Sequence, residues 1–424
     1  MIDIKLLKKN KSEFLAKLAL KRFICSESEF DALEQEFHSA KVALEESFAR
    51  RNALSAQFGK AMAQKSSTEQ LSQEIEECKK VVANAQARFD NVEERWNHFC
   101  SLIPNCPDDT VPVGASETDN VVIKKVGEPA RLTGLDHTEL LAKSGLLMTD
   151  AAAALSGARF NVLKGPLAKL HRALIQFMLA FNGEHGGYQE YYVPYLVRKS
   201  AMFGTGQLPK FHDDLFHVDG DNGGYYLIPT AEVPLTNLFA DQIRKAEEFP
   251  VRLMAHTPCF RAEAGSYGKD LKGIFRQHQF EKVELVHCVL PDQAEQEFQS
   301  LVNQVTKLLT ALELPHQQVA LCAGDLGFSS QRTIDFEVWM PGQQRYREIS
   351  SCSYFGDFQA RRMKARYKNM QTGQNEFIHT INGSGIAVGR ALIALIENHG
   401  TEEGCAIPKA LQPFCNNQSW ISWA

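Results

Sequence analysis

Two long series of apolar residues near the N-terminus constrain the fold more than any other feature of the sequence. The first series runs over residues 30–61 in steps of three and four, interrupted only by Ser47 and Arg51, and the second runs over residues 71–99. A polar break at residues 64–69 separates them. Heptad spacing predicts two helices paired along an apolar seam, and the short break makes the pair antiparallel. We therefore predict a projecting coiled-coil arm over about residues 28–100.

Charge is unevenly distributed along this arm. Residues 50–80, around its tip, carry six bases against four acids, whereas the flanking stretches 28–49 and 81–100 carry nine acids and three bases. From charge alone, a solvated helical face explains this pattern better than an RNA contact does. The whole chain has a formal net charge of −5, so any nucleic-acid contact must come from a local basic patch.

The rest of the composition is that of an ordinary globular protein and argues against zinc-binding, secreted and membrane-spanning proteins. The ten cysteines include no CxxC pair and no zinc-finger spacing, so we expect no zinc, and scattered thiols favour a reducing cytoplasm. The sequence has no run of 18 apolar residues, and its N-terminus lacks the apolar core of a secretion signal. We therefore expect a cytoplasmic protein that makes no use of a membrane.

A segment rich in proline and acidic residues, 106–120, predicts the boundary between an N-terminal helical domain, 1–105, and a larger domain, 121–424. Within the larger domain we expect a short helix at Asp136–Thr149. A strong helix at Pro166–Phe181 should be followed by a strand at Tyr188–Pro194 that proline ends. Further strands and helices are expected toward the C-terminus.

The stretch Cys259–Glu284 has the most distinctive chemistry. Its two runs, Pro258–Glu263 and Phe275–Glu284, flank residues rich in Gly, Ser and Lys, which predicts an antiparallel hairpin with a long mobile loop. Arg261 offers a planar set of donors for a phosphate or carboxylate, and Glu263 would share its strand face. Phe280 supplies an aromatic plate. An ordinary surface hairpin with an Arg–Glu pair explains these residues about equally well.

Weaker candidates lie on either side of this hairpin. Thr230 and Glu232 stand two apart and suit an ammonium group or a small hydroxylated substrate, although a strand end with a capping threonine is the simpler interpretation. Carboxylates at residues 335, 337 and 348 are the hard oxygen ligands that Mg²⁺ prefers. A glycine-rich bend, Gly383–Gly385, between a strand and a helix at Ile386–Glu397 is a weak sign of nucleotide binding.

The stretch Cys259–Glu284 closely resembles motif 2 of class II aminoacyl-tRNA synthetases, in the form found in the bacterial-type seryl-tRNA synthetase family. It has FRAEAGS, a basic loop and then HQFEKVE. Further segments match that family in the same order: IPTAEVPLTN (Ile228–Asn237), REISSCS (Arg347–Ser353), DFQARRM (Asp357–Met363) and NGSGIAVGR (Asn382–Arg390). Together they span roughly half of the chain, which makes the signal very specific.

The resemblance implies an α+β fold, in which a class II catalytic domain forms an antiparallel sheet flanked by helices. It also implies a homodimer built on the helix and strand of residues 166–194. It implies ATP-dependent activation of L-serine and transfer to tRNA(Ser), with tRNA(Sec) left open, and tRNA binding by the arm. It also implies three sets of site residues. The ATP-binding residues are Arg261, Ala262, Glu263, Gln277, Phe280, Glu348, Ile349, Ser350, Ser351 and Arg390. The serine-binding residues are Thr230, Ala231, Glu232, Arg261, Glu284, Asn382 and Ser384. Arg261, Arg390 and Glu348 would be catalytic, and Glu348 with Ser351 would hold Mg²⁺.

Two alternative functions remain at this point. One is an enzyme that makes seryl-adenylate but loads a carrier protein or a small amine, and the intact arm argues against it. The other is a non-enzymatic RNA-binding relative, which the retained Arg261, Glu348 and Arg390 argue against. The C-terminal tail carries Trp420 and Trp423, which we expect to pack on the body of the protein rather than to contact a partner.

Overall fold

The computed structural model describes residues 1–129, 134–264 and 273–424. They form two compact units. The smaller unit is Phe23–Pro104, and the larger unit combines Met1–Arg22 with Asn105–Ala424. The domain range 1–105 predicted from the sequence places the first 22 residues with the arm. In the structure they belong to the larger unit.

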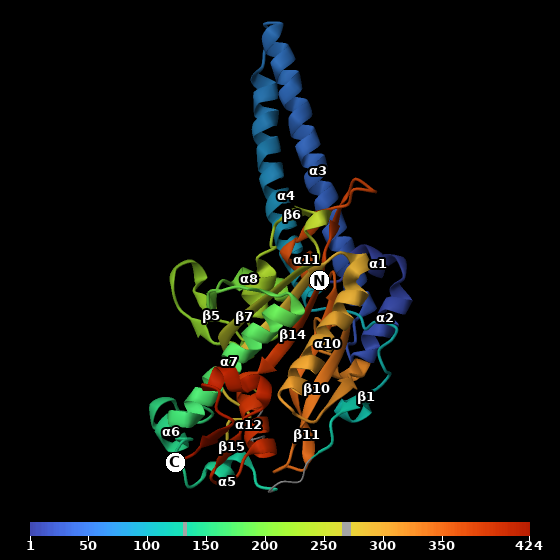
Figure 1. Ribbon diagram of the computed structural model, residues 1–424. Coiled ribbons are helices and arrows are strands. Elements are labelled where there is room, and N and C mark those ends of the chain that lie inside the picture. The colour runs from blue at the N-terminus through green and yellow to red at the C-terminus, as the bar shows by residue number, and fades with distance from the viewer. Residues whose placement is uncertain (130–133, 265–272) are drawn as a thin grey trace. The chain divides into compact units, whose positions relative to one another are not determined.

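The smaller unit is a pair of long helices, α3 (Glu27–Ala63) and α4 (Glu69–Ser101), that lie side by side (Figure 1). The hydroxyl of Ser26 begins α3 by accepting a hydrogen bond from the Glu29 amide at 3.2 Å. Apolar seam positions such as Leu44 are buried, which confirms the predicted heptad pairing. Ser47 is tolerated in this seam because its hydroxyl donates to the Leu44 carbonyl at 2.7 Å.

The larger unit is built on an eight-stranded sheet in the order β1-β9-β10-β11-β14-β8-β7-β2. Every neighbouring pair is antiparallel except β2 with β7, so the predicted antiparallel sheet is confirmed apart from one parallel edge. The strands are β1 (Val121–Val126), β9 (His316–Ala320), β10 (Arg332–Met340), β11 (Arg345–Gly356), β14 (His379–Ala387), β8 (Gln279–Val289), β7 (Val251–Phe260) and β2 (Gln189–Glu190).

Three helices cover one face of this sheet, namely α7 (Gly165–Gly186), α10 (Ala294–Ala311) and α12 (Val388–His399) (Figure 1). Their apolar sides form the main core with the sheet, where Phe298 and Phe336 are fully buried. Burial of each such side chain stabilises the fold by roughly 1.5–3 kcal/mol. The opposite face packs against α9 (Glu232–Asn237) and α11 (Phe358–Met363). The site described below lies on that second face.

Smaller elements complete the larger unit. Its first segment forms two short helices, which divide at Asn10. The remaining elements are α1 (Ile4–Lys9), α2 (Lys11–Leu20), α5 (His137–Leu141), α6 (Thr149–Ser156), α8 (Lys199–Thr205), β3 (Leu196–Val197), β4 (His217–Val218), β5 (Tyr225–Leu227), β6 (Ile243–Lys245), β12 (Arg366–Lys368), β13 (Asn375–Phe377), β15 (Gly404–Ala406) and β16 (Trp420–Ser422).

Two local predictions were too long. The helix expected at Asp136–Thr149 is shorter and covers only the five residues of α5. Gly145 has a positive φ of 64°, which is incompatible with a continuing α-helix. The strand expected at Tyr188–Pro194 shortens to the two residues of β2. Gly187 ends α7 in the left-handed conformation, with a φ of 67°.

The glycine-rich bend predicted at residues 383–385 was wrong, because both glycines lie inside β14. A Cβ atom at Gly383 would lie 3.0 Å from the Leu301 side chain of α10, and one at Gly385 would lie 3.0 Å from the Asn182 side chain of α7. The glycines therefore let the covering helices approach the sheet closely, and α12 begins after the strand at Val388.

The C-terminal tail packs on the larger unit. Strand β16 pairs with β15, and Trp423 is buried, with its indole N–H donating to the Thr401 carbonyl at 3.0 Å. Trp420 is 43% exposed, so only one of the two tryptophans packs as expected. Over the part of the chain that the structure describes, no helix has both the length and the apolar character needed to cross a bilayer.

Candidate active site

The hairpin that carries Arg261 has a different geometry from the predicted one. Strands β7 and β8 pair in a register that sets Cys259 opposite Phe280, but β7 ends at Phe260 and β8 begins only at Gln279. Arg261 and Glu263 therefore lie beyond the strand and do not share a strand face, which corrects the prediction. Glu263 adopts a positive φ of 52°. The predicted mobile loop falls largely on residues 265–272, outside the described residues.

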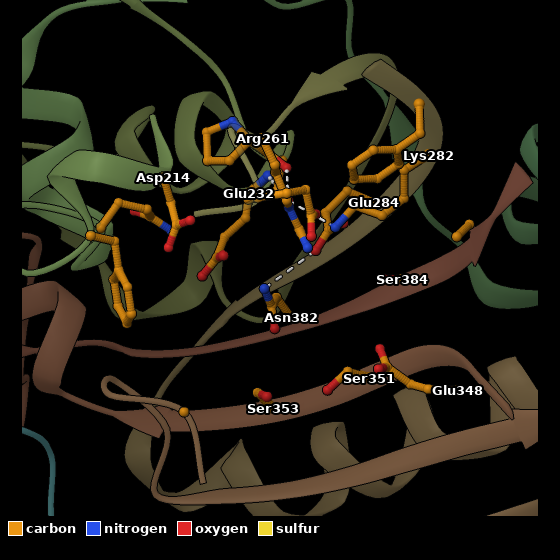
Figure 2. A pocket seen from close by; sticks show the side chains of 18 of the residues that line it. Asp214, Glu232, Arg261, Lys282, Glu284, Glu348, Ser351, Ser353, Asn382 and Ser384 are labelled. Atoms are coloured by element: carbon orange, nitrogen blue, oxygen red, sulfur yellow. Dashed lines mark hydrogen bonds and ion pairs between the residues drawn. The ribbon is translucent and has the colours of Figure 1, made fainter. Parts of the chain in front are cut away.

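A single cavity of about 780 Å³ brings together residues that lie far apart in the sequence (Figure 2). Pockets of this size hold small-molecule ligands in many proteins. Thirteen of the sixteen predicted site residues line it: Thr230, Glu232, Arg261, Glu263, Gln277, Phe280, Glu284, Glu348, Ile349, Ser351, Asn382, Ser384 and Arg390.

The other three predicted residues do not line the cavity. Ala231 is fully buried in the core between α9 and the sheet. Ser350 turns away, and its hydroxyl donates to the Ser384 carbonyl at 2.6 Å, which ties β11 to β14. Ala262 is held by its backbone, whose N–H donates to the Asp214 carbonyl at 2.9 Å. Their side chains supply no group to the cavity.

One end of the cavity is a small polar pocket. Glu232 begins α9 and Glu284 lies on β8, and both carboxylates are buried. Lys282, two residues before Glu284 on the same face of β8, forms an ion pair with it and donates to the Thr230 hydroxyl at 3.0 Å. The Asn382 amide donates to Glu284 at 3.3 Å (Figure 2). A compact set of two acids, one ammonium and one hydroxyl suits a small zwitterion with a hydroxyl group.

Burial sets the charge state of this polar end. It raises the pKa of Glu232 to about 7, and the neighbouring Glu284 carboxylate adds to the rise. The Gln359 amide opposes this by donating to Glu232 at 2.6 Å. Burial also raises the pKa of Glu284, against the pull of Lys282. Glu232 is therefore the acid poised to gain or lose a proton near neutral pH, and an incoming ammonium group would favour its charged form.

The other end of the cavity presents arginines and aromatic rings. The Arg261 guanidinium lies 5.1 Å from the centroid of the Phe280 ring. Arg390, at the start of α12, lies 4.8 Å from the centroid of Phe275 and donates to the Glu348 carbonyl at 2.7 Å. Arg347 lies 3.9 Å from the same Phe275 centroid. Cations beside flat apolar plates suit a ligand that combines phosphates with an aromatic base.

A group of oxygen donors lies beside these arginines on β10 and β11. Asp335 pairs in register with Ser351, and Glu337 with Glu348. Burial, and then the charge of Glu348, raise the pKa of Asp335 well above its usual value. Among the described residues its Oδ1 atom has no hydrogen-bond partner. A buried carboxylate oxygen without a donor, next to a second carboxylate and a hydroxyl, fits a divalent cation shared with ligand phosphates.

Three residues of this site had no role in the sequence analysis. Lys282 could have been found from the alternation of Phe280, Lys282 and Glu284, which places all three on one face of a strand. Gln359 lies in the DFQARRM match, but nothing in the sequence indicates that it reaches Glu232. Asp214 accepts a hydrogen bond from the Ala264 amide at 2.9 Å, a contact across 50 residues that no local pattern reveals.

Comparison with known proteins agrees with this geometry. Residues 1–107 match the family model of the seryl-tRNA synthetase N-terminal domain, and residues 216–399 match that of the tRNA synthetase class II core domain (G, H, P, S and T). A serine–tRNA ligase from Marinobacter nauticus is 48% identical over 98% of both chains. The chain belongs to the serine–tRNA ligase family.

Other members of the family agree over the full length. The serine–tRNA ligase of Teredinibacter turnerae is 47% identical over 100% of both chains. The seryl-tRNA synthetase of Pyrococcus horikoshii, solved with ATP, is 30% identical with a TM-score of 0.87, and covers 100% of this chain and 99% of its own. The cytoplasmic enzyme of Naegleria fowleri, solved with AMP, is 26% identical with a TM-score of 0.84 over the same shares. The predicted family and fold are thus confirmed.

Proposed function

We propose that the protein activates L-serine with ATP to form seryl-adenylate and pyrophosphate, and then transfers the seryl group to tRNA(Ser). The observation that carries this proposal is the single cavity with a polar end for a small hydroxy amino acid and a cationic, aromatic end for a nucleotide. Arg261 lines the cavity together with both groups of residues. Membership of the serine–tRNA ligase family supports the same conclusion.

In the first step, a carboxylate oxygen of serine attacks the α-phosphorus of ATP, and the bond to the leaving pyrophosphate breaks. The nucleophile is already ionised, so the chain needs to supply no base for it. Arg261 would hold the α-phosphate and the serine carboxylate, and Arg390 the γ-phosphate. Phe280 would stack on the adenine. Catalysis would come mainly from positioning and charge stabilisation.

At the other end of the cavity, Glu232 and Glu284 would receive the ammonium group and the hydroxyl of serine. Thr230, Asn382 and Ser384 complete the lining. Because these polar groups are buried, alanine would leave them without a partner, and the pocket would reject it. Neither Ala231 nor Ala262 has a side chain that takes part.

Glu348 and Ser351 would hold Mg²⁺, with the adjacent Asp335 as a further oxygen donor. Bound there, it would neutralise charge on the triphosphate. The expectation that the protein needs no zinc stays a prediction, which metal analysis of the purified protein tests.

In the second step, a ribose hydroxyl at the 3′ end of the tRNA attacks the seryl carbonyl, and AMP leaves. The α3–α4 arm would bind the body of the tRNA through basic side chains around the tip of the arm. Lys60, Lys65, Lys79 and Lys80 are all exposed there, which supports this role.

The protein would work as a homodimer in the cytoplasm. Strand β2 is an edge of the large sheet, and Tyr192 beside it is 90% exposed, which suits a surface that a second copy covers. All ten cysteines are free thiols, in keeping with a reducing compartment. A mass measurement by light scattering would test the dimer: twice the chain mass of 47.5 kDa supports it, and the mass of one chain contradicts it.

The test of the activity is ATP–pyrophosphate exchange with each of the twenty amino acids, with and without tRNA. We expect exchange with serine and aminoacylation of tRNA(Ser). Exchange without charging of any tRNA would favour the carrier-loading alternative. The absence of exchange with any amino acid would refute the proposed enzymatic activity.

A second experiment separates the two halves of the reaction. Deletion of residues 30–99, with a short linker in their place, should spare serine-dependent exchange and abolish tRNA charging. Undiminished charging by this variant would refute the role of the arm. Loss of exchange would show instead that the arm is needed for activation.

A further inference from the structure

The segment Gly327–Ser330 forms part of the cavity wall, and all four of its residues line the cavity. We call it the wall segment. It precedes β10 and belongs to no helix or strand. The Phe328 ring packs edge-on against Phe211 and Phe358, with centroids 6.2 and 5.7 Å apart. Since regular secondary structure does not fix the backbone of this wall, its carbonyl groups must find other donors.

Lys21, near the N-terminus, donates to three of these carbonyl groups. It follows α2, and its ammonium nitrogen lies 2.6 Å from the Gly327 carbonyl oxygen, 3.3 Å from that of Phe328 and 2.9 Å from that of Ser330. Burial lowers the pKa of Lys21 to about 7. A cation in such surroundings is costly, and the converging carbonyl dipoles offset the cost.

The Ser330 N–H donates to the Gly327 carbonyl at 3.2 Å, and Asn105 supplies further donors. Its backbone N–H donates to the Phe328 carbonyl at 3.0 Å, and its side-chain amide donates to the Ser329 carbonyl at 2.9 Å. The same amide donates to the Phe355 carbonyl at 2.8 Å, which fixes the wall segment to β11. Two residues, more than 200 positions away, thus hold all four consecutive carbonyls of the wall segment.

The wall segment is connected to the polar end of the cavity by a short series of hydrogen bonds. The Ser329 hydroxyl donates to the Thr205 carbonyl at 3.4 Å. The Gln359 amide donates to the same carbonyl at 3.2 Å and to the Glu232 carboxylate at 2.6 Å. Displacement of the wall segment would therefore change the position of the Glu232 carboxylate. Arg390 and Phe275, at the nucleotide end, take no part in this series.

We propose that Lys21 and Asn105 are positioning residues for the amino-acid end of the cavity, acting through the wall segment on Glu232. The two residues stand where the chain enters and leaves the arm, Phe23–Pro104, so the segment before the arm is a working part of the active site. This inference rests on the proposed function, since its readout is the affinity for serine.

The test compares Lys21→Met and Asn105→Ala with wild type in the exchange assay, measuring KM for serine and KM for ATP separately. We expect KM for serine to rise about five- to tenfold in each variant, because the wall segment loses its anchors. We expect KM for ATP to change by less than about twofold. Lys21→Arg keeps several donors and should remain close to wild type.

Lys17→Met is the matched control, because Lys17 lies one turn earlier, on α2, but pairs at 2.7 Å with Asp109, away from the wall segment. It should leave both KM values unchanged. A merely structural role would lower thermal stability and the active fraction without moving KM for serine. Unchanged KM for serine in both variants, or equal rises in both KM values, would overturn the inference. If Lys21→Met does not fold, Asn105→Ala and Lys21→Arg decide the matter. Failure of wild type to exchange with serine would instead refute the proposed function.

Discussion

Replacement of Glu232 by glutamine tests the amino-acid end of the cavity in the most detail. Burial raises the pKa of Glu232 to about 7 in the free protein, above the ordinary value of 4.5. Only the ionised form can hold the ammonium group of serine. As the pH falls through 7 the carboxylate gains a proton, so affinity for serine is present above pH 7 and is lost below it. Between pH 8 and pH 6 the ionised fraction, and with it the affinity, should fall about tenfold.

The Glu232→Gln variant removes the charge and keeps the shape. The side-chain carbonyl oxygen of the new amide can still accept from the Gln359 amide, so the surrounding hydrogen bonds survive. Loss of a charge-assisted hydrogen bond costs roughly 1.5–3 kcal/mol, which corresponds to a rise in KM for serine at pH 8 of about 10- to 150-fold. Because the titrating group is gone, KM for serine should then be nearly independent of pH.

The assay is serine-dependent ATP–pyrophosphate exchange at pH 6, 7 and 8 and constant ionic strength, for wild type and Glu232→Gln. Glu402→Gln is the control, because Glu402 pairs with Lys143 on the surface at 2.7 Å. A tenfold pH effect that persists in Glu232→Gln would refute the reasoning and would point to Glu284 as the titrating group.

Two further predictions concern the nucleotide end and the core. Arg261→Ala should abolish exchange, while the exposed Arg345→Ala retains it; wild-type exchange rates in Arg261→Ala would contradict the phosphate assignment. Burial alone would raise the pKa of Glu297, but the His287 ring, 3.0 Å away, and hydrogen bonds from Arg252 lower it to about 2. Its contribution to stability is therefore present above pH 4.5 and is lost as the pH falls toward 2. Glu297→Gln should cost about 3 kcal/mol at pH 7 and about 1.4 kcal/mol at pH 3 in urea unfolding. An equal loss at both values would contradict this.

Sequence patterns predicted those features that depend on local periodicity or on residues held close together in a motif. The heptads of α3 and α4 are of this kind, because a coiled-coil seam repeats in the sequence itself. The cavity residues were predicted from the resemblance of several segments to motifs of the seryl-tRNA synthetase family. No local pattern indicated that strands β7, β8, β11 and β14 meet. The alternation along β8 could have placed Phe280, Lys282 and Glu284 on one face.

Other features depend on contacts that no local pattern carries. Gly383 and Gly385 suggested a bend, but they serve to let α10 and α7 approach a continuous strand. Lys21 and Asn105 hold the wall segment across more than 200 residues, and neither belongs to a motif. Strand ends also depend on tertiary context, which is why Arg261 was placed on a strand that stops one residue before it.

The most direct measurement is a crystal structure of the protein with serine and a non-hydrolysable ATP analogue. The account predicts one cavity occupied at both ends, with the Arg261 guanidinium touching the α-phosphate and the serine carboxylate, and with Glu232 at the ammonium group. Serine bound elsewhere, or an Arg261 side chain directed away from both ligands, would contradict it.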